Sequence, residues 1–198
     1  MSGTWPTSPG PASIQLIPKD PVLDDTAQSG KSQSRIIAGK LWGIQIAYDE
    51  QRSENMAPVF AFANSQRGDS FQIVVPGHDA PLGVATGAPV VDGAHVAGDS
   101  TVAIRGFTPS TAAILKAGTV LKFGNHSKVY MLNSDVDSDI NGETTLNLDI
   151  PIIEALAGGE SLIITNVPFT VKVDGEIQAW RTKSPRLSRY TADLIEKI

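Results

Sequence analysis

The sequence predicts a mainly β protein with one helix, built as a discontinuous domain around an inserted β-module. Apolar residues alternate with polar or small ones in several short segments, which is the pattern of strands with one buried face. The chain contains 18 glycines and 13 prolines, a content that favours turns over long helices. Because the strongest alternation lies at 35–78 and 169–198, we expect these segments to share one domain. Residues 82–167 are expected to form a separate β-module.

The composition excludes several classes of protein. The 198 residues include no cysteine, which excludes a disulfide framework, a thiolate zinc site, an iron–sulfur cluster and a cysteine nucleophile. No apolar run approaches the roughly 18 residues of a transmembrane helix, so no membrane partner is expected. The formal net charge is -5 and the pI is about 5.1. This acidic balance argues against a protein that grips nucleic-acid phosphates.

Residues 1–34 differ from the rest and are expected to form an N-terminal arm, partly flexible. Pro6, Pro9 and Pro11 lie among Ser, Thr and Gly, which favours either a mobile arm or an extended strap. Residues 14–17 are a short apolar island that predicts one strand. The polar run 24–31 then predicts a loop.

The first domain is expected to read strand, helix, strand. Asn55 is a candidate helix cap, Pro58 would lie in the first turn, and Gly68 stands where a C-terminal glycine belongs. The alternating apolar residues of the strand before the helix are Trp42, Ile44, Ile46 and Tyr48. The apolar side of the helix contains Met56, Phe60 and Ala63, and the strand after it contains Phe71, Ile73 and Val75.

The middle of the chain predicts about five short strands in roughly 80 residues, which indicates a small barrel or sandwich. These candidate strands lie around residues 102–104, 120–123, 128–132, 144–150 and 162–165.

The final section returns to strong alternation. Phe169, Val171 and Val173 predict a strand, and the Asp174-Gly175 pair that follows predicts a hairpin turn, with Ile177 and Trp180 on its return strand. Tyr190, Ala192 and Leu194 predict a last strand, although Leu187, Thr191, Leu194 and Ile198 also fit helical spacing.

The acidic stretch at 135–143 is the most metal-like motif of the chain. Asp135, Asp137 and Asp139 alternate as in a calcium loop, but Ile140 replaces the turn glycine and Leu146 replaces the bidentate glutamate. We therefore expect a solvated polar loop, with no metal and no cofactor.

Other catalytic motifs are incomplete. Gly30-Lys31-Ser32 ends like a phosphate-binding loop, but Asp25 occupies the place of its first glycine. His78, His95 and His126 are too far apart in sequence for a metal motif, and we interpret His78 and His126 as surface turn residues. The sequence therefore predicts no enzyme; a hydrolase with paired carboxylates ranks last among the alternatives.

Aromatic residues supply the candidate site. An aromatic cluster could bind sugar rings, but Trp42 and Trp180 lie on alternating strands and favour a core or subunit-interface role. The candidate core or interface residues are Trp42, Ile44, Ile46, Tyr48, Phe60, Phe71 and Trp180.

The order of several strings resembles the distal tail proteins of long-tailed bacteriophages, in their short form with an inserted OB-like domain. Residues 41–48, the helix after them, and 66–71 with 74–76 resemble the N-terminal half of that family. Residues 115–119 and 126–130 resemble the entry into its OB-like barrel. Residues 146–152 and 169–180 resemble a later barrel segment and the return to the first domain.

The resemblance implies a structural virion protein at the distal end of the phage tail. Family members form a hexameric ring that joins the tail tube to the tail-tip or baseplate apparatus and lets DNA pass without specific binding. It also implies a first domain, related to tail tube proteins as a β-sandwich or barrel, that lines the ring, with the OB-like domain outside. The implied partners are further copies of the chain, the tail tube protein and tail-tip or hub proteins.

Other readings stay open at this point. A tail tube or baseplate adaptor of the same architecture is one alternative, and a carbohydrate-binding module of a tail tip is another. Charge bears on the ring, because inward-facing cations would trap DNA phosphates. We therefore expect the basic residues Arg181, Lys183, Arg186 and Arg189 to face a protein partner or the outer surface.

Overall fold

The computed structural model describes residues 3–20, 22–26, 30–36, 39–66, 68–175, 179, 181–183 and 186–198. Within these ranges the protein is mainly β with one helix, which confirms the predicted fold class. The chain divides into two compact units. Unit 1 comprises residues 1–5, 69–171 and 197–198, and unit 2 comprises residues 6–68 and 172–196. The domain boundaries drawn from the sequence stay a prediction.

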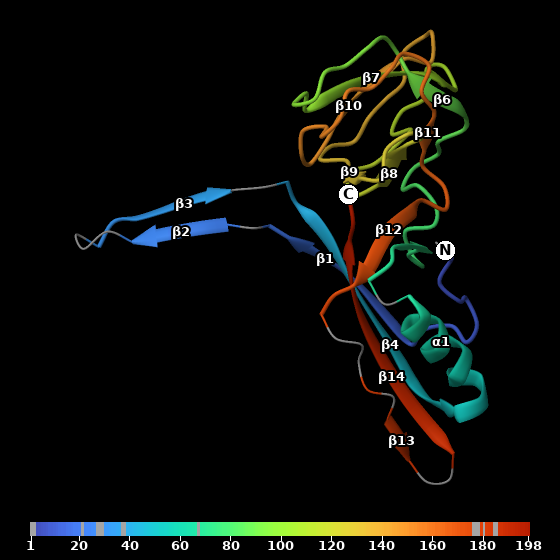
Figure 1. Cartoon of the computed structure of the whole chain (residues 1–198). Helices are drawn as coiled ribbons and strands as arrows, with labels where there is room; N and C mark the ends of the chain where they lie inside the picture. The colour runs from blue at the N-terminus through green and yellow to red at the C-terminus, as the bar shows by residue number, and fades with distance from the viewer. Residues whose placement is uncertain are drawn as a thin grey trace. The chain divides into compact units, whose positions relative to one another are not determined.

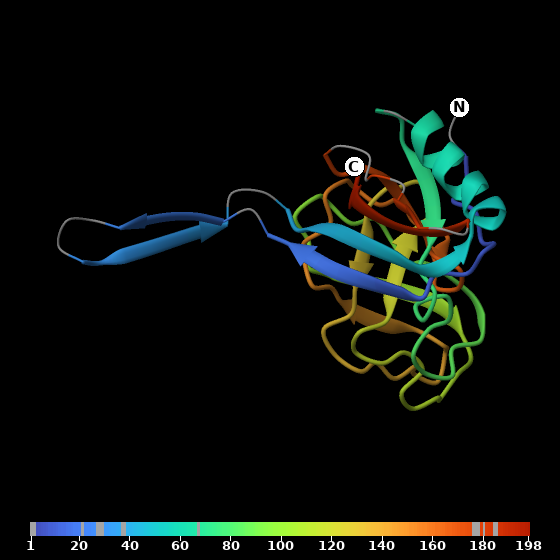
Figure 2. The same ribbon diagram turned by 90° about the horizontal axis from the view of Figure 1, so that it is seen from below.

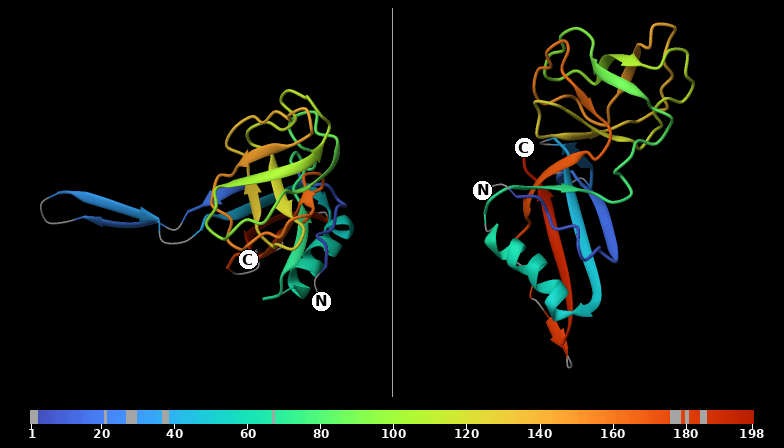
Figure 3. Two further views of the ribbon diagram at one scale, coloured as in Figure 1. Left: turned by 90° about the horizontal axis from the view of Figure 1, so that it is seen from above. Right: turned by 90° about the vertical axis from the view of Figure 1, so that its right-hand side faces the viewer.

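Unit 2 is built on long antiparallel strands. Strand β4 (Leu41–Arg52) pairs with β1 (Ser13–Lys19) on one side and with β14 (Leu187–Glu196) on the other (Figure 1; Figure 3, right). The register brings Tyr48 opposite Tyr190, although 142 residues separate them in sequence (190 minus 48). Both predicted strands at 42–48 and 190–194 are confirmed, and the helical alternative for the C-terminus is wrong.

Helix α1 (Ser53–Ser65) follows β4 without a break. Its N-cap is Arg52 rather than the expected Asn55, and no side chain caps it; Ser53 N–H instead donates to Arg186 O at 2.9 Å. Pro58 lies inside the helix, not in its first turn. The helix buries Met56, Val59 and Ala63, while Phe60 is half-buried.

The composition of residues 24–31 predicts a loop, but the start of this polar run belongs to a strand. Strands β2 (Val22–Thr26) and β3 (Ser32–Ile36) pair there as an antiparallel hairpin (Figure 2). The short strand β13 (Arg181–Lys183) pairs with β14. The predicted return strand after Gly175 cannot be compared, because Ile177 and Trp180 lie outside the described residues.

Unit 1 begins with an extended N-terminal segment whose backbone pairs with a strand of this unit. Trp5 N–H donates to Gln72 O at 2.8 Å, and Gln72 N–H donates to Gly3 O at 2.9 Å. Gln72 belongs to β5 (Phe71–Val74), which pairs with β12 (Pro168–Val173). Trp5 is buried and its ring stacks on Phe71 at 5.5 Å.

The rest of unit 1 contains the predicted small barrel. One sheet has the order β10-β7-β6 and the other β11-β8-β9 (Figure 3, left). Backbone pairs join the sheets on both sides, through Val90 with Ser161 and Leu132 with Leu148. The six strands, one more than expected, are β6 (Gly87–Val91), β7 (Thr101–Phe107), β8 (Val120–Phe123), β9 (Val129–Met131), β10 (Thr144–Asn147) and β11 (Leu162–Ile163).

The barrel encloses its own hydrophobic core. Buried members come from every strand and from the loops between them, and all lie between Val91 and Leu162 in sequence. Phe123 and Tyr130 meet edge to face at 5.6 Å in this core, and the Tyr130 hydroxyl accepts a hydrogen bond from Ile153 N–H. Asn166 N–H donates to Asp79 O at 2.6 Å, so the chain enters and leaves the barrel at neighbouring points.

Candidate functional site

The β1–β4–β14 sheet of unit 2 has one buried face and one open face. On the buried face, Tyr48 and Tyr190 stack at 6.5 Å, and Phe60 of α1 meets Tyr190 edge to face at 5.8 Å. Burial, followed by the neighbouring Tyr48 and Asp193, raises the pKa of Tyr190 to about 12. Because successive side chains of a strand lie on opposite faces, the residues between these buried positions lie on the open face and are accessible to a partner.

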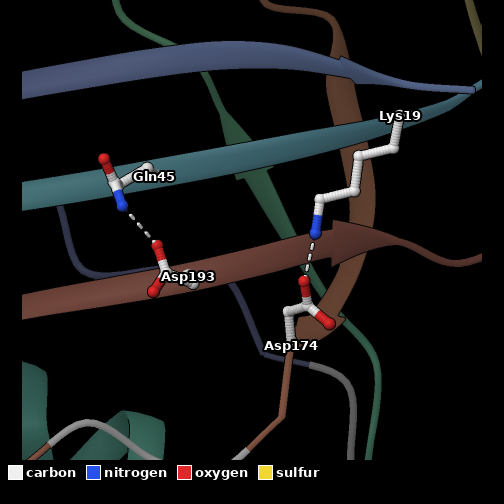
Figure 4. Close-up of polar contacts among 4 residues, drawn as sticks. All are labelled: Lys19, Gln45, Asp174 and Asp193. Atoms are coloured by element: carbon white, nitrogen blue, oxygen red, sulfur yellow. Dashed lines mark hydrogen bonds and ion pairs between the residues drawn. The ribbon is translucent and has the colours of Figure 1, made fainter.

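Polar side chains cross the open face from strand to strand. Gln45 Nε2 of β4 donates to Asp193 Oδ1 of β14 at 2.8 Å (Figure 4). Lys19 of β1 forms an ion pair with Asp174. A Cβ at Gly43 would lie 2.8 Å from Lys19 Cε, so the glycine leaves room for the lysine side chain to cross the sheet. The open face is thus an ordered polar surface rather than a second core.

A cationic pair lies at one end of this face. Arg181 of β13 is directly opposite Arg189 of β14 in the antiparallel ladder, and both side chains are exposed. They line an open depression together with Gln45, Ala179, Thr191 and Asp193. Arg181, Arg186 and Arg189 are exposed, and the Lys183 side chain lies outside the described ones. That this basic stretch faces a protein partner or the outer surface stays a prediction.

The candidate residues from the sequence separate into three groups. Trp42, Ile44, Ile46 and Tyr48 are all buried on one face of β4. Phe60 joins them in unit 2 through its contact with Tyr190, whereas Phe71 belongs to unit 1. Trp180 lies outside the described residues.

Trp42 contacts groups that sequence reasoning missed. Its backbone N–H donates to Glu196 Oε2 at 3.1 Å, and Glu196 is itself buried. The Lys40 ammonium lies 4.6 Å from the centre of the Trp42 ring, within cation–π range. Glu196 follows three alternating apolar positions of β14 in phase, which is the signal that would have placed it on the buried face.

The sequence predicts His126 to be a surface turn residue, and this prediction is wrong because its side chain is buried. Its side chain is 3% exposed, and its Nε2 lies 3.9 Å from Glu160 Oε1, which also accepts a hydrogen bond from Asn125 N–H. Among the residues that the structure describes, none forms a hydrogen bond with His126 Nδ1. His78 is partly exposed in a bend after β5, which is compatible with the surface position expected for it. His95 Nε2 accepts from Ala103 N–H at 3.2 Å, which gives this side chain a structural role.

The acidic stretch uses its carboxylates on the backbone. Asp135 Oδ1 accepts from Ala117 N–H, Asp137 Oδ1 from Ala113 N–H, and Asp139 Oδ1 from Asn141 and Glu143 N–H. Across the described part of the chain, no group of three or more His, Cys, Asp or Glu residues is placed to hold a metal ion. These carboxylates order the loops at one end of the barrel.

Comparison with known proteins gives one informative similarity. No protein-family model matches the chain. No helix within the described ranges is long and apolar enough to cross a membrane. The chain is 25% identical over 178 residues to the distal tail protein pb9 of Escherichia phage T5. The similarity covers 81% of this chain and 78% of pb9.

Proposed function

We propose that this protein is a structural component of a phage tail, located at the distal end of the virion tail as a distal tail protein. The observation that carries the proposal is the similarity to T5 pb9, which spans most of both chains. The mainly β fold with a single helix is compatible with that role. The proposed molecule is a hexameric ring that joins the tail tube to the tail-tip or baseplate apparatus.

The proposed ring domain combines residues 35–78 and 169–198, with an OB-like barrel at 82–167 inserted between them. Two observations support this division. Strand β4 pairs with β14 across the sequence gap, and the Asp79–Asn166 hydrogen bond brings the ends of the barrel segment together. Insertions are tolerated where the two ends of the inserted domain lie close together. In the proposed ring, the first domain lines the hole and the barrel faces outward.

The proposed role involves no catalysis and no cofactor. The acidic residues that looked most like a metal loop are hydrogen-bonded to backbone N–H groups, and His95 likewise binds a backbone amide. Structural use of these side chains supports a protein that acts through its surfaces. An overall charge of -5 suits a channel through which DNA slides without specific binding.

The test is electron microscopy of the purified protein, alone and mixed with the tail tube and tail-tip proteins of the same phage. We expect hexameric rings with a central hole, alone or seated on the tube. Rings of a symmetry other than three- or sixfold, or a barrel that lines the channel, would overturn the proposal. So would a chain that joins neither tube nor tip. Specific binding in a glycan array, without any ring, would favour the carbohydrate-binding alternative.

A further inference from the structure

The N-terminal residues 3–5 cover a sheet edge of unit 1. Strand β5 is the last strand of its sheet, and on its outer side Thr4 pairs in parallel with Gln72. The Trp5 side chain is 5% exposed and its ring stacks on Phe71. An uncovered strand edge presents unpaired N–H and C=O groups to any other chain, here beside an aromatic ring. The outer edge of β5 therefore needs an extended segment that covers it.

The linker that follows, residues 6–11, has no polar anchor of its own. Its residues form no hydrogen bond or ion pair within the part of the chain that the structure describes. The next backbone contact is the hydrogen bond from Ala12 N–H to Ala47 O at 2.9 Å. Three residues of the linker are prolines, which have no N–H to donate. From Trp5 to Ala12 this linker spans at most about 25 Å when fully extended.

The contacts of residues 3–5 do not depend on which copy of the chain supplies them. The boundary between the two compact units falls between Trp5 and Pro6, so the linker carries the chain out of unit 1 at this point. Exchange of an identical element between copies keeps the same contacts and costs little free energy. Which copy occupies the β5 edge then depends on the local concentration of neighbouring copies, compared with the effective concentration that the linker sets.

We propose that, when copies assemble, residues 3–5 of one copy cover the β5 edge of a second copy, with Trp5 as the anchor. The contact joins two different surfaces, so it is head-to-tail and can close into a ring. The exchange itself involves two copies; its role in a ring rests on the proposed function. Because the link consists of backbone hydrogen bonds and a buried ring, salt is expected to leave it intact.

Disulfide trapping tests the exchange directly, since the natural chain contains no cysteine and Thr4 lies across from Gln72. Thr4→Cys copies and Gln72→Cys copies are expressed together, so that exchange can occur during folding, and are then oxidised. We expect a covalent dimer of the two variants. The matched control pairs Thr4→Cys with Thr101→Cys, which places a cysteine at an exposed position of the barrel. A dimer yield no higher than in this control overturns the proposal.

A double variant, with Thr4→Cys and Gln72→Cys in the same chain, compares the two arrangements in one sample. If the segment covers the β5 edge of its own chain, denaturing electrophoresis shows a monomer with an internal disulfide. If copies exchange their segments, it shows covalently linked oligomers. We expect linked oligomers whose share rises with protein concentration, and internal disulfides alone at every concentration overturn the proposal.

Substitution of the anchor identifies the group responsible. Trp5→Ala in the Thr4→Cys copy is expected to abolish the dimer with the Gln72→Cys copy, because no ring then stacks on Phe71. Trp5→Phe keeps an aromatic ring at this position and is the matched control, expected to retain the dimer. Circular dichroism verifies that each variant is folded. A dimer yield that Trp5→Ala leaves unchanged overturns the proposal.

Microscopy of the same samples separates this inference from the proposed function. Hexameric rings of the double variant that contain only internal disulfides would leave the ring standing and overturn the exchange. Linked dimers that depend on Trp5, without rings in any sample, would support the exchange between two copies and count against the hexameric ring.

Discussion

Trp42 is a buried residue whose contribution to the stability of unit 2 can be measured. The side chain is 2% exposed, and its N–H donates to the buried Glu196 carboxylate. Trp42→Ala is expected to lower the free energy of unfolding by about 3–5 kcal/mol, the usual cost of removing a buried aromatic side chain. Urea denaturation measures it. Ile17→Ala, at a position 38% exposed, is the control and is expected to stay within about 0.5 kcal/mol.

Tyr190 gives the protein a pH dependence in the alkaline range. Its pKa is raised to about 12, first by burial and then by Tyr48 and Asp193, whereas a free tyrosine titrates near 10. Because the folded state favours the neutral phenol, this contribution is complete below about pH 10 and is lost as the pH rises toward 12. Tyr190→Phe is expected to flatten the fall in unfolding free energy over that window. Identical slopes for the variant and the natural protein would contradict the assignment.

Residue-level prediction fails where the partner is distant in sequence. His126 follows Gly124 and Asn125, a turn-like string, so no local pattern indicates that its ring is buried beside Glu160. Burial of Trp42 and Tyr48 was predictable, because alternation along one strand is a local signal. Contacts such as Tyr48 with Tyr190 depend on pairing across 142 residues, which a single sequence does not encode locally.

At the scale of elements, two glycines of the barrel loops allow the cost of a strained backbone to be compared with the cost of steric crowding. Gly142 and Gly159 both have positive φ, of 75° and 85°. A Cβ at Gly142 would lie 2.2 Å from Phe107 O, whereas a Cβ at Gly159 has open space. Gly159→Ala is expected to cost about 1–2 kcal/mol from the left-handed conformation alone. Gly142→Ala should cost clearly more in urea denaturation; equal costs would show that the loop yields to the added methyl group.

The acidic loop at 135–143 is expected not to bind calcium. Its carboxylates already accept backbone hydrogen bonds from Ala113, Ala117 and Glu143. A calcium site saturated at 100 times its dissociation constant would add about 2.7 kcal/mol, a shift that thermal denaturation detects. We expect no shift in Tm on adding calcium. A rise in Tm that Asp137→Ala abolishes would establish a calcium site instead.

Elements with clear alternation were predictable, and those with unusual composition were not. Strands β4, β5, β12 and β14 follow alternating apolar residues. Strand β2 contains Asp24 and Asp25, and residues of that type are depleted in strands, so the composition predicts a loop where the hairpin lies. Strand β6 contains Gly87 and Pro89, residue types that also weaken a strand prediction, so the sequence does not predict this strand. Helix α1 was found, but Asn55 misplaced its start because the helix begins without a side-chain cap.

At the scale of the whole molecule, the inserted barrel is expected to fold alone. Its buried core lies entirely between Val91 and Leu162, and the partly buried residues packed on it extend only to Ala85 and Ile164. The Asp79–Asn166 hydrogen bond closes the two ends of the segment. A fragment of residues 79–167 therefore keeps every strand of the barrel and its whole core, within the size range in which a single domain folds by itself.

Tyr130 supplies a selective signal for this last prediction, because residues 79–167 contain no tryptophan and no other tyrosine. We expect the fragment to unfold cooperatively in urea, with tyrosine fluorescence and circular dichroism changing at the same midpoint. Phe123→Ala removes the ring that packs on Tyr130 and is expected to cost about 3–5 kcal/mol. A fragment that binds the dye ANS and loses its structure gradually would behave as a molten globule, which would contradict an independent inserted domain. Its core would then depend on the remainder of the chain.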